Sequence, residues 1–368
     1  MLTALYIHIP FCDKICIYCD FHKEMAKDSK KQRYIDALLK ELGSYQNQLK
    51  DLKTVYIGGG SPTSLSNSDL IKVLQSINEV IDVDKLEEFT IEANPNNITK
   101  EKADVLYSFG VNRVSMGVQT FNDEHLQFLN REHKEEDIKE SIRLLRQAGI
   151  TNINIDMIFS LPNQTLNELR YDLDNVITLN PSHISYYSLI FEEKTKLYYL
   201  LEKNEVSTNS EDLEALMYNE IINSLKSNGY LHYEISNYAK EGFESKHNLV
   251  YWKNMDYLGI GSGSHSLYDN KRFFNIRNVS KYIENVFTNQ SSKQHEEIEP
   301  LREEMMMGLR LIEGINVTEV ENKYKINLLD TYPKLNYYIK EGLLKIENNK
   351  LSFTKTGLML GNLVFSIF

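Results

Sequence analysis

The chain has 368 residues, of which 42% are hydrophobic and 25% are charged, an ordinary balance for a globular protein. This length predicts two domains, or one large barrel with an appendage. The formal net charge of −11, from 41 Lys and Arg against 52 Asp and Glu, argues against a broad nucleic-acid-binding surface.

Strand and helix patterns alternate through residues 1–230. Strands are predicted at residues 5–9, 54–57, 89–93, 113–118, 153–159 and 183–190. Helices are predicted at residues 34–49, 68–81, from 99 onward, 135–148, 166–179 and 211–227. This alternation is typical of βαβ units with a parallel sheet, so we predict an α/β fold, a partial (β/α)6 TIM-like barrel. A doubly wound sheet is the alternative, because the sequence does not fix the order of the strands.

The pattern changes after the barrel. Residues 231–299 show no regular period and are predicted to be an irregular connecting region. Residues 300–368 form a smaller α+β domain, with helices at 301–311, 317–324 and 335–341, a hairpin turning at two asparagines and a last helix from 356. This order resembles a winged helix. With 9 Lys and Arg against 8 Asp and Glu in residues 301–368, a packing or lid domain is favoured over a DNA reader.

The cysteine content bears on the cell compartment. Three cysteines are too few, and odd in number, for a disulfide scaffold. The N-terminus shows no signal-peptide pattern, and no apolar run reaches the length of about 18 residues that a membrane-spanning helix needs. We therefore expect a soluble, cytoplasmic protein whose thiols stay reduced and free to bind metal.

All three cysteines, Cys12, Cys16 and Cys19, lie in one C-x3-C-x2-C segment directly after the first predicted strand. One interpretation is a structural zinc site with His22 as fourth ligand. A second is a redox or catalytic thiol pair. A third is an iron–sulfur cluster held by three thiolates, which leaves one iron open. An open iron is useful only beside a small-molecule site, so the third interpretation predicts one on the same rim.

Polar and glycine residues recur where the predicted strands end. Three glycines occupy residues 58–60 after the second strand, and Glu92, Gln119, Arg131 and Asp156 follow or end later strands. The carboxyl ends of parallel barrel strands meet on one face, so these residues should converge beside the cysteine segment. The alternative is that Glu92, Arg131 and Asp156 only pair with one another as an ion network.

Several segments together carry a family resemblance: YIHIPFC, GGGSPT, IEANP, SMGVQTFN, NREH and DMIFSLPNQT. With the cysteine spacing, they resemble the radical S-adenosylmethionine (SAM) superfamily, and within it the oxygen-independent coproporphyrinogen III oxidase group, over nearly the whole chain. The resemblance implies a radical SAM barrel whose three cysteines hold a [4Fe-4S] cluster, with SAM on the open iron. It assigns the SAM pocket to Tyr6, Tyr18, Gly59, Gly60, Ser61, Glu92, Gln119, Arg131 and Asp156.

Two features depart from the oxidases. Those enzymes carry a further cysteine where this chain has Phe21, and residues 247–252, HNLVYW, resemble a motif of the haem chaperone branch of the group. The resemblance implies haem binding, with His247 as an axial ligand and Tyr251 and Trp252 as a flat wall for the porphyrin. His265 is a second candidate ligand, and an ordinary structural role is the alternative for His247.

The function predicted from these departures is that of a haem chaperone. It would bind haem and transfer it to acceptor proteins, with membrane-bound respiratory proteins among the candidates and a peripheral membrane contact as a consequence. The alternative is an oxygen-independent coproporphyrinogen III oxidase, which decarboxylates propionates by a radical route. Because of Phe21 and HNLVYW, we do not expect that activity, and we expect no nucleic-acid partner.

Overall fold

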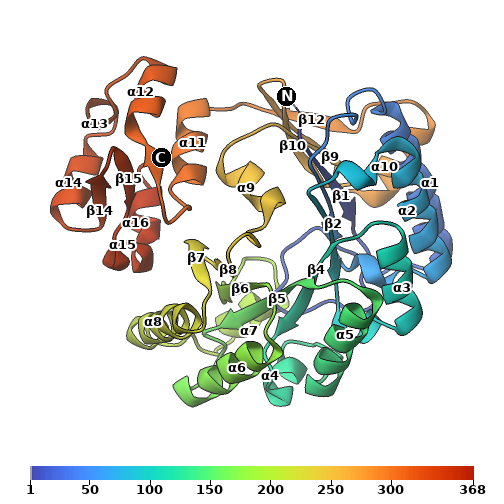
Figure 1. Cartoon of the computed structure of the whole chain (residues 1–368), viewed down its shortest axis with the longest axis horizontal. Helices are drawn as coiled ribbons and strands as arrows, with labels where there is room; N and C mark the ends of the chain where they lie inside the picture. Colours follow the sequence, from blue (N-terminus) through green and yellow to red (C-terminus); the bar gives the residue numbers. More distant parts are fainter. Residues whose placement is uncertain (1) are drawn as a thin grey trace.

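The computed structural model describes residues 2–368 and contains one twelve-stranded sheet (Figure 1). Its centre is made of six parallel strands, β1 (Ala4–Ile9), β2 (Thr54–Gly59), β3 (Glu88–Ala93), β4 (Arg113–Gln119), β5 (Asn152–Phe159) and β6 (His183–Ser188). They lie in chain order within the sheet, which is the order of a barrel. The predicted α/β barrel with six parallel strands is confirmed, and the doubly wound alternative is wrong.

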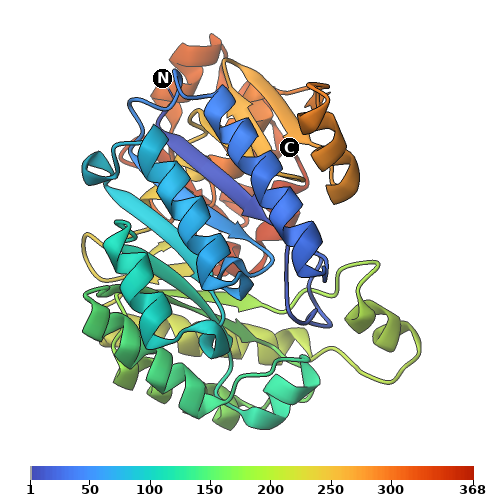
Figure 2. The same ribbon diagram turned by 90° about the vertical axis from the view of Figure 1, so that its right-hand side faces the viewer.

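Helices lie around the outside of this curved sheet (Figures 1 and 2). They are α1 (Asp28–Ser44), α2 (Asn67–Val80), α3 (Lys100–Ser108), α4 (Asp123–Phe128), α5 (Glu135–Ala148), α6 (Leu166–Leu179) and α8 (Glu211–Ser227). Helix α7 (Lys196–Glu202) instead lies against the cysteine loop, where Leu197 N donates to Ile17 O (2.9 Å). Helix α5 shows why they form where they do. Its residues Ile138, Ile142 and Leu145 recur at helical spacing and are buried, and Gly149 ends the helix at φ 107°, a value that favours glycine.

Alternation along the strands separates an apolar outer face from a polar inner face. On β4, Val114 and Met116 point outward into the core that the helices cover, and both are fully buried. Arg113 and Ser115 point to the opposite face and are buried as well. The hydrophobic core therefore lies between sheet and helices, while the concave interior is lined by polar groups.

Residues 231–299 are regular, and the prediction of an irregular connection is wrong. They form β7 (Leu231–Glu234), β8 (Asn237–Ala239), α9 (Lys246–Trp252), β9 (Tyr257–Ile260), β10 (His265–Tyr268), β11 (Lys271–Asn275), α10 (Val279–Phe287) and β12 (Lys293–Glu296). Strand β8 pairs with β6 at one edge of the six-stranded centre, and β9 pairs in parallel with β1 at the other. The chain thus crosses the concave side between these edges, and α9 lies on that side (Figure 1).

The C-terminal residues form a small domain with its own sheet and hydrophobic core. Its elements are α11 (Pro300–Gly308), β13 (Ile315–Asn316), α12 (Val317–Tyr324), α13 (Leu328–Thr331), α14 (Lys334–Lys340), β14 (Leu344–Glu347), β15 (Lys350–Phe353), α15 (Lys355–Met359) and α16 (Gly361–Phe365). Asn348 and Asn349 both have positive φ, as the predicted tight hairpin turn requires. Within residues 2–368 there is no helix both long enough and apolar enough to span a bilayer.

Candidate functional site

The three cysteines lie in the loop between β1 and α1, at the carboxyl end of the strand. Backbone hydrogen bonds fix this loop, from Glu24 N to Pro10 O (2.7 Å) and from Cys12 N to Glu24 O (3.1 Å). A Cβ built on Gly60 would lie 2.8 Å from Cys12 Sγ, so only glycine lets the second strand approach the loop this closely. The cysteine loop and the glycine segment therefore form one packed unit.

Within the part of the chain that the structure describes, no fourth metal-ligating side chain gathers with the thiols. All three cysteines are free, and among residues 2–368 no three His, Cys, Asp or Glu side chains already gather as a metal site. His22, the fourth ligand in the zinc interpretation, instead has its Nε2 hydrogen-bonded to Ser262 Oγ (2.9 Å) and its ring stacked on His8. A loop with three thiols and no fourth ligand is the donor set expected for a cluster with one open iron.

Arg131 connects the cysteine loop to the strand ends. Its guanidinium donates to Asn94 Oδ1 (2.6 Å) and to the hydroxyl of Tyr18 (3.0 Å), while its buried Nε has no partner among residues 2–368. Gln119 ends β4 at a bulge with φ 74°, and a Cβ on Gly117 would come within 3.0 Å of both Gln119 and Arg131. The rim is thus shaped tightly here, and one guanidinium donor remains unused.

Glu92 is fixed at the end of β3. One carboxylate oxygen accepts from Gly59 N (2.9 Å), and the other accepts from the Tyr56 hydroxyl (2.9 Å). Burial, with a smaller contribution from the nearby Asp156 carboxylate, raises the pKa of Glu92 to about 7. A Cβ on Gly58 would lie 2.9 Å from the Glu92 carboxyl group. The glycine segment therefore gives the carboxyl group space as well as a hydrogen bond.

Other predicted pocket residues have defined places on the same rim. Asp156 accepts from Asn154 Nδ2 (2.7 Å) and from the Ser115 hydroxyl (3.0 Å), and burial raises its pKa. Buried Ser61 follows the glycines and donates to Asn97 Oδ1 (3.4 Å). Within the described residues, no ion pair joins Glu92, Arg131 or Asp156 to one another, so the structure does not support the ion-network alternative.

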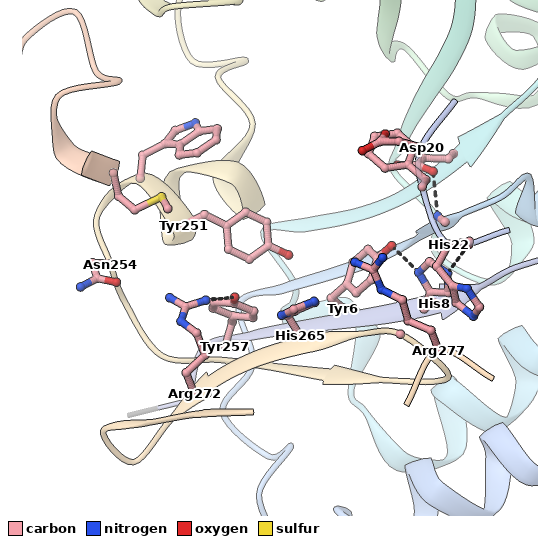
Figure 3. Close-up of a pocket in the computed structure, with 16 residues that line it drawn as sticks. Tyr6, His8, Asp20, His22, Tyr251, Asn254, Tyr257, His265, Arg272 and Arg277 are labelled. Atoms are coloured by element: carbon pink, nitrogen blue, oxygen red, sulfur yellow. Dashed lines mark hydrogen bonds between the residues drawn. The ribbon is translucent and has the colours of Figure 1, made fainter. Parts of the chain in front are cut away.

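A cavity of about 480 Å³ opens inside the barrel (Figure 3), within the size range of small-molecule sites. It brings two sets of predicted residues together. From the SAM set it is lined by Tyr6, Gly59 and Glu92, and from the haem set by Tyr251 and Trp252. His265 lines it as well, whereas the other residues of the two sets do not. Cys16 and Arg131 line a separate small pocket.

His247 does not line this cavity. It lies in α9, not in a loop, and is fully buried. Its Nδ1 is hydrogen-bonded to Thr54 Oγ1 (2.8 Å) and its Nε2 to the Tyr251 hydroxyl (2.8 Å), and burial lowers its pKa to about 3. Both ring nitrogens are thus engaged inside the protein. The prediction of His247 as an axial haem ligand is not supported in this arrangement, and the structural alternative is favoured.

Helix α9 is anchored at the floor of the barrel, at the start of the strands. The Glu88 carboxylate accepts from the backbone N–H of Lys246 (2.8 Å) and His247 (3.2 Å) and from the Ser245 hydroxyl (3.3 Å). A negative charge at the first turn stabilises a helix. This anchoring carries Tyr251 and Trp252, one turn later, to the cavity wall.

The cavity also has lining residues that the sequence analysis did not assign to a small-molecule pocket. His8 and His22 come from β1 and the cysteine loop, and Arg272 and Arg277 from β11 and the turn after it. Met307 of α11 also lines the cavity, so the C-terminal domain covers part of it. His265, named from the sequence only as a second ligand, lies among them (Figure 3). Arg272 and Arg277 lie in a short strand and in the turn after it, which show no periodic pattern, so no sequence signal marks them.

Comparison with known proteins identifies the family. Residues 6–176 match the model of the Radical SAM superfamily, and residues 296–360 match that of the HemN C-terminal domain. The chain is 38% identical over 375 residues to the protein called heme chaperone HemW of Bacillus subtilis, covering 100% of this chain and 99% of that one. It is 39% identical to heme chaperone HemW of Lactococcus lactis, covering 100% and 97%. This chain belongs to the HemW family.

A solved structure shows the same fold. Coproporphyrinogen III oxidase (HemN) of Escherichia coli, described as a radical SAM enzyme, superposes with a TM-score of 0.84 at 23% identity, covering 100% of this chain and 89% of that one. At this identity the likeness concerns the fold alone. The radical SAM domain implies a [4Fe-4S] cluster and SAM, and the full-length HemW relatives favour the haem chaperone over the oxidase alternative.

Phe21 lies where the cysteine loop meets the cavity of this HemW-family site. It follows the last cysteine by two positions, is 69% exposed and lines the cavity. Where the oxidase pattern has a further thiol, this chain thus has an apolar ring. The substitution changes the surface that a ligand in the cavity contacts and leaves the three cysteines unchanged.

Proposed function

We propose that this chain binds haem in the central cavity and passes it to acceptor proteins. The observation that carries the proposal is that one cavity borders both the cysteine loop, through Phe21 and His22, and the aromatic residues of α9. The names of the HemW relatives support it. Respiratory proteins of the membrane are candidate acceptors, and a cytoplasmic chaperone would meet them by a peripheral contact.

The cluster and SAM would occupy the rim beside this cavity. Cys12, Cys16 and Cys19 would hold a [4Fe-4S] cluster, which when bound with SAM supplies one-electron chemistry. The N–H groups of Gly59 and Gly60 are already bonded, to Glu92 and to Ile9 O. The glycines would therefore give SAM space, while the carboxylates of the rim would accept from its amine and hydroxyl groups.

Haem would lie against the aromatic wall of α9. Tyr251 and Trp252 offer the flat surfaces that a porphyrin requires. The Arg310 guanidinium lies 4.5 Å from the centre of the Trp252 ring and supports it from the C-terminal domain. His265 is the better iron ligand, because its ring is about 40% exposed and its Nε2 has no hydrogen bond among the described residues.

The only tryptophan of the chain, Trp252, provides the test. Haem titrated into the anaerobically reconstituted protein should quench Trp252 fluorescence with the same midpoint at which a Soret band develops. Trp252→Phe should abolish the fluorescence signal and keep the Soret change. The loaded protein should then pass haem to an apo-haem protein. Absence of stoichiometric haem binding would refute the proposal.

The same preparation tests the oxidase alternative. It would be incubated anaerobically with SAM, a reductant and coproporphyrinogen III. We expect no protoporphyrinogen beyond the protein-free control. Repeated turnover to protoporphyrinogen would establish the enzyme instead.

A further inference from the structure

Two arginines line the cavity, and only one of them is paired. Arg272 makes a two-pronged ion pair with Glu303 (3.0 and 2.8 Å) and also donates to the Tyr257 hydroxyl (3.3 Å). The guanidinium of Arg277 has no hydrogen bond and no ion pair with any residue of 2–368. Arg272 therefore ties the sheet to the C-terminal domain, whereas Arg277 is a free cation.

Arg277 points into the cavity, across from the aromatic wall. Figure 3 shows it beside His8 and His22, with Tyr251 on the far side. Its positive charge helps to lower the pKa values of both histidines and of His265. Its electrostatic effect thus reaches every imidazole that lines the cavity.

Two acidic residues, Asp20 and Glu92, also line the cavity, and within the described residues neither pairs with Arg277. The two oxygens of Glu92 are already bonded to Gly59 and Tyr56. The cavity therefore combines a flat aromatic wall, imidazole nitrogens and one unpaired guanidinium. A guanidinium pairs with a carboxylate through two parallel hydrogen bonds, which gives strength and direction. The matching ligand is a flat macrocycle with a carboxylate at its edge.

We propose that Arg277 binds a propionate of the tetrapyrrole, so that the cavity selects macrocycles with free carboxylates and orients them. This inference rests on the proposed function. The propionate edge would face the turn after β11, the opposite face of the ring would contact α9, and the iron would lie near His265. Arg277 is thereby a specificity-determining residue, whereas Arg272 is not.

The test compares haem with haem dimethyl ester, which keeps the iron and the ring but lacks both carboxylates. Both are titrated into the full-length protein in the same detergent buffer, by Soret absorbance and Trp252 fluorescence. The wild type should bind haem about tenfold or more tightly than the ester, as expected for a hydrogen-bonded charge pair. Arg277→Gln should weaken haem about tenfold and leave the ester unchanged. The haem affinity of Arg277→Lys should lie between those of the wild type and Arg277→Gln.

Arg33→Gln is the matched control. Arg33 is exposed on α1 and has no partner among the described residues, so its loss changes the net charge equally. It should alter neither affinity. Arg277 is exposed as well, so the melting temperature of Arg277→Gln should match that of the wild type.

The outcomes separate the two proposals. If the wild type binds haem and the ester equally, the carboxylate inference is wrong and haem binding stands. If Arg277→Gln weakens both ligands equally, Arg277 does not recognise a carboxylate. If the wild type binds no haem, the proposed function fails, and the inference fails with it.

Discussion

The barrel interior has a floor, where the strands begin, and a mouth, which is the cavity at the strand ends. Similar polar residues lie in both, but their hydrogen bonding differs. At the floor, His247 has both ring nitrogens bonded, and Glu88 accepts hydrogen bonds at both carboxylate oxygens. At the mouth, Arg277 has no partner, and the buried Nε1 of Trp252 has none among the described residues. Polar groups whose hydrogen bonds are all made within the protein hold the fold together, and those with unused hydrogen bonds are available to a ligand.

Arg113 is an exception at the floor. It is 1% exposed, its Nε has no partner among the described residues, and its one side-chain hydrogen bond is a long one to Thr90 Oγ1 (3.5 Å). Its positive charge lowers the pKa values of Glu92 and Asp156, opposing the effect of their burial. From the floor, Arg113 thus affects the ionisation of Glu92 and Asp156, because its positive charge favours the charged form of both rim carboxylates.

The largest expected effect comes from replacing His247 at the floor, and His265 at the mouth provides the comparison. His247→Ala should lower the free energy of unfolding by about 2–5 kcal/mol, because it leaves Thr54 and Tyr251 without partners and opens a cavity. His265→Ala should change it by less than about 0.5 kcal/mol, since that ring is partly exposed. Urea unfolding measures both.

The haem spectra of the same variants sharpen the comparison. His265→Ala should shift the Soret band of the haem complex, and a folded fraction of His247→Ala should keep the wild-type spectrum. The reverse pattern, with a stable His247→Ala protein and an altered Soret band, would show that α9 rearranges to offer His247 to the iron. It would also show that the division between floor and mouth is wrong.

A smaller effect is expected at the first turn of α9, which Glu88 anchors. Glu88→Gln removes the charge beneath α9 and should cost about 2 kcal/mol of unfolding free energy, since three hydrogen bonds to a buried carboxylate weaken. The neighbour provides the control. Glu87 pairs with Lys246 at the surface, and Glu87→Gln should cost at most about 0.5 kcal/mol. Equal losses in both variants would contradict an anchoring role for the floor.

The sequence predicts local elements well and distant pairings poorly. Helix α5 has the predicted bounds, because its apolar spacing and its terminal glycine are local signals. The strand-end position of Glu92 was likewise visible. The role of His247 was not, because its partners Thr54 and Glu88 lie 193 and 159 residues away in the chain. Strands of three to five residues, such as β8 and β11, are too short to show a period.

The smallest expected effect concerns the pH dependence of Glu92 at the mouth. Its pKa of about 7 in the folded protein lies above its ordinary value of 4.5, so folding favours the protonated carboxyl group. This contribution to stability is fully present below pH 4.5 and is lost as the pH rises through about 7. Glu92→Gln keeps a neutral side chain of the same shape at every pH.

Between pH 6 and 7, the unfolding free energy of the ligand-free wild type should therefore fall by about 1 kcal/mol relative to that of Glu92→Gln. His8, whose pKa burial lowers to about 4, is present in both proteins and cancels from the difference. A difference that does not vary with pH would mean that the carboxylate is as well stabilised at the mouth as in water. Glu92 would then resemble the fully hydrogen-bonded groups of the floor.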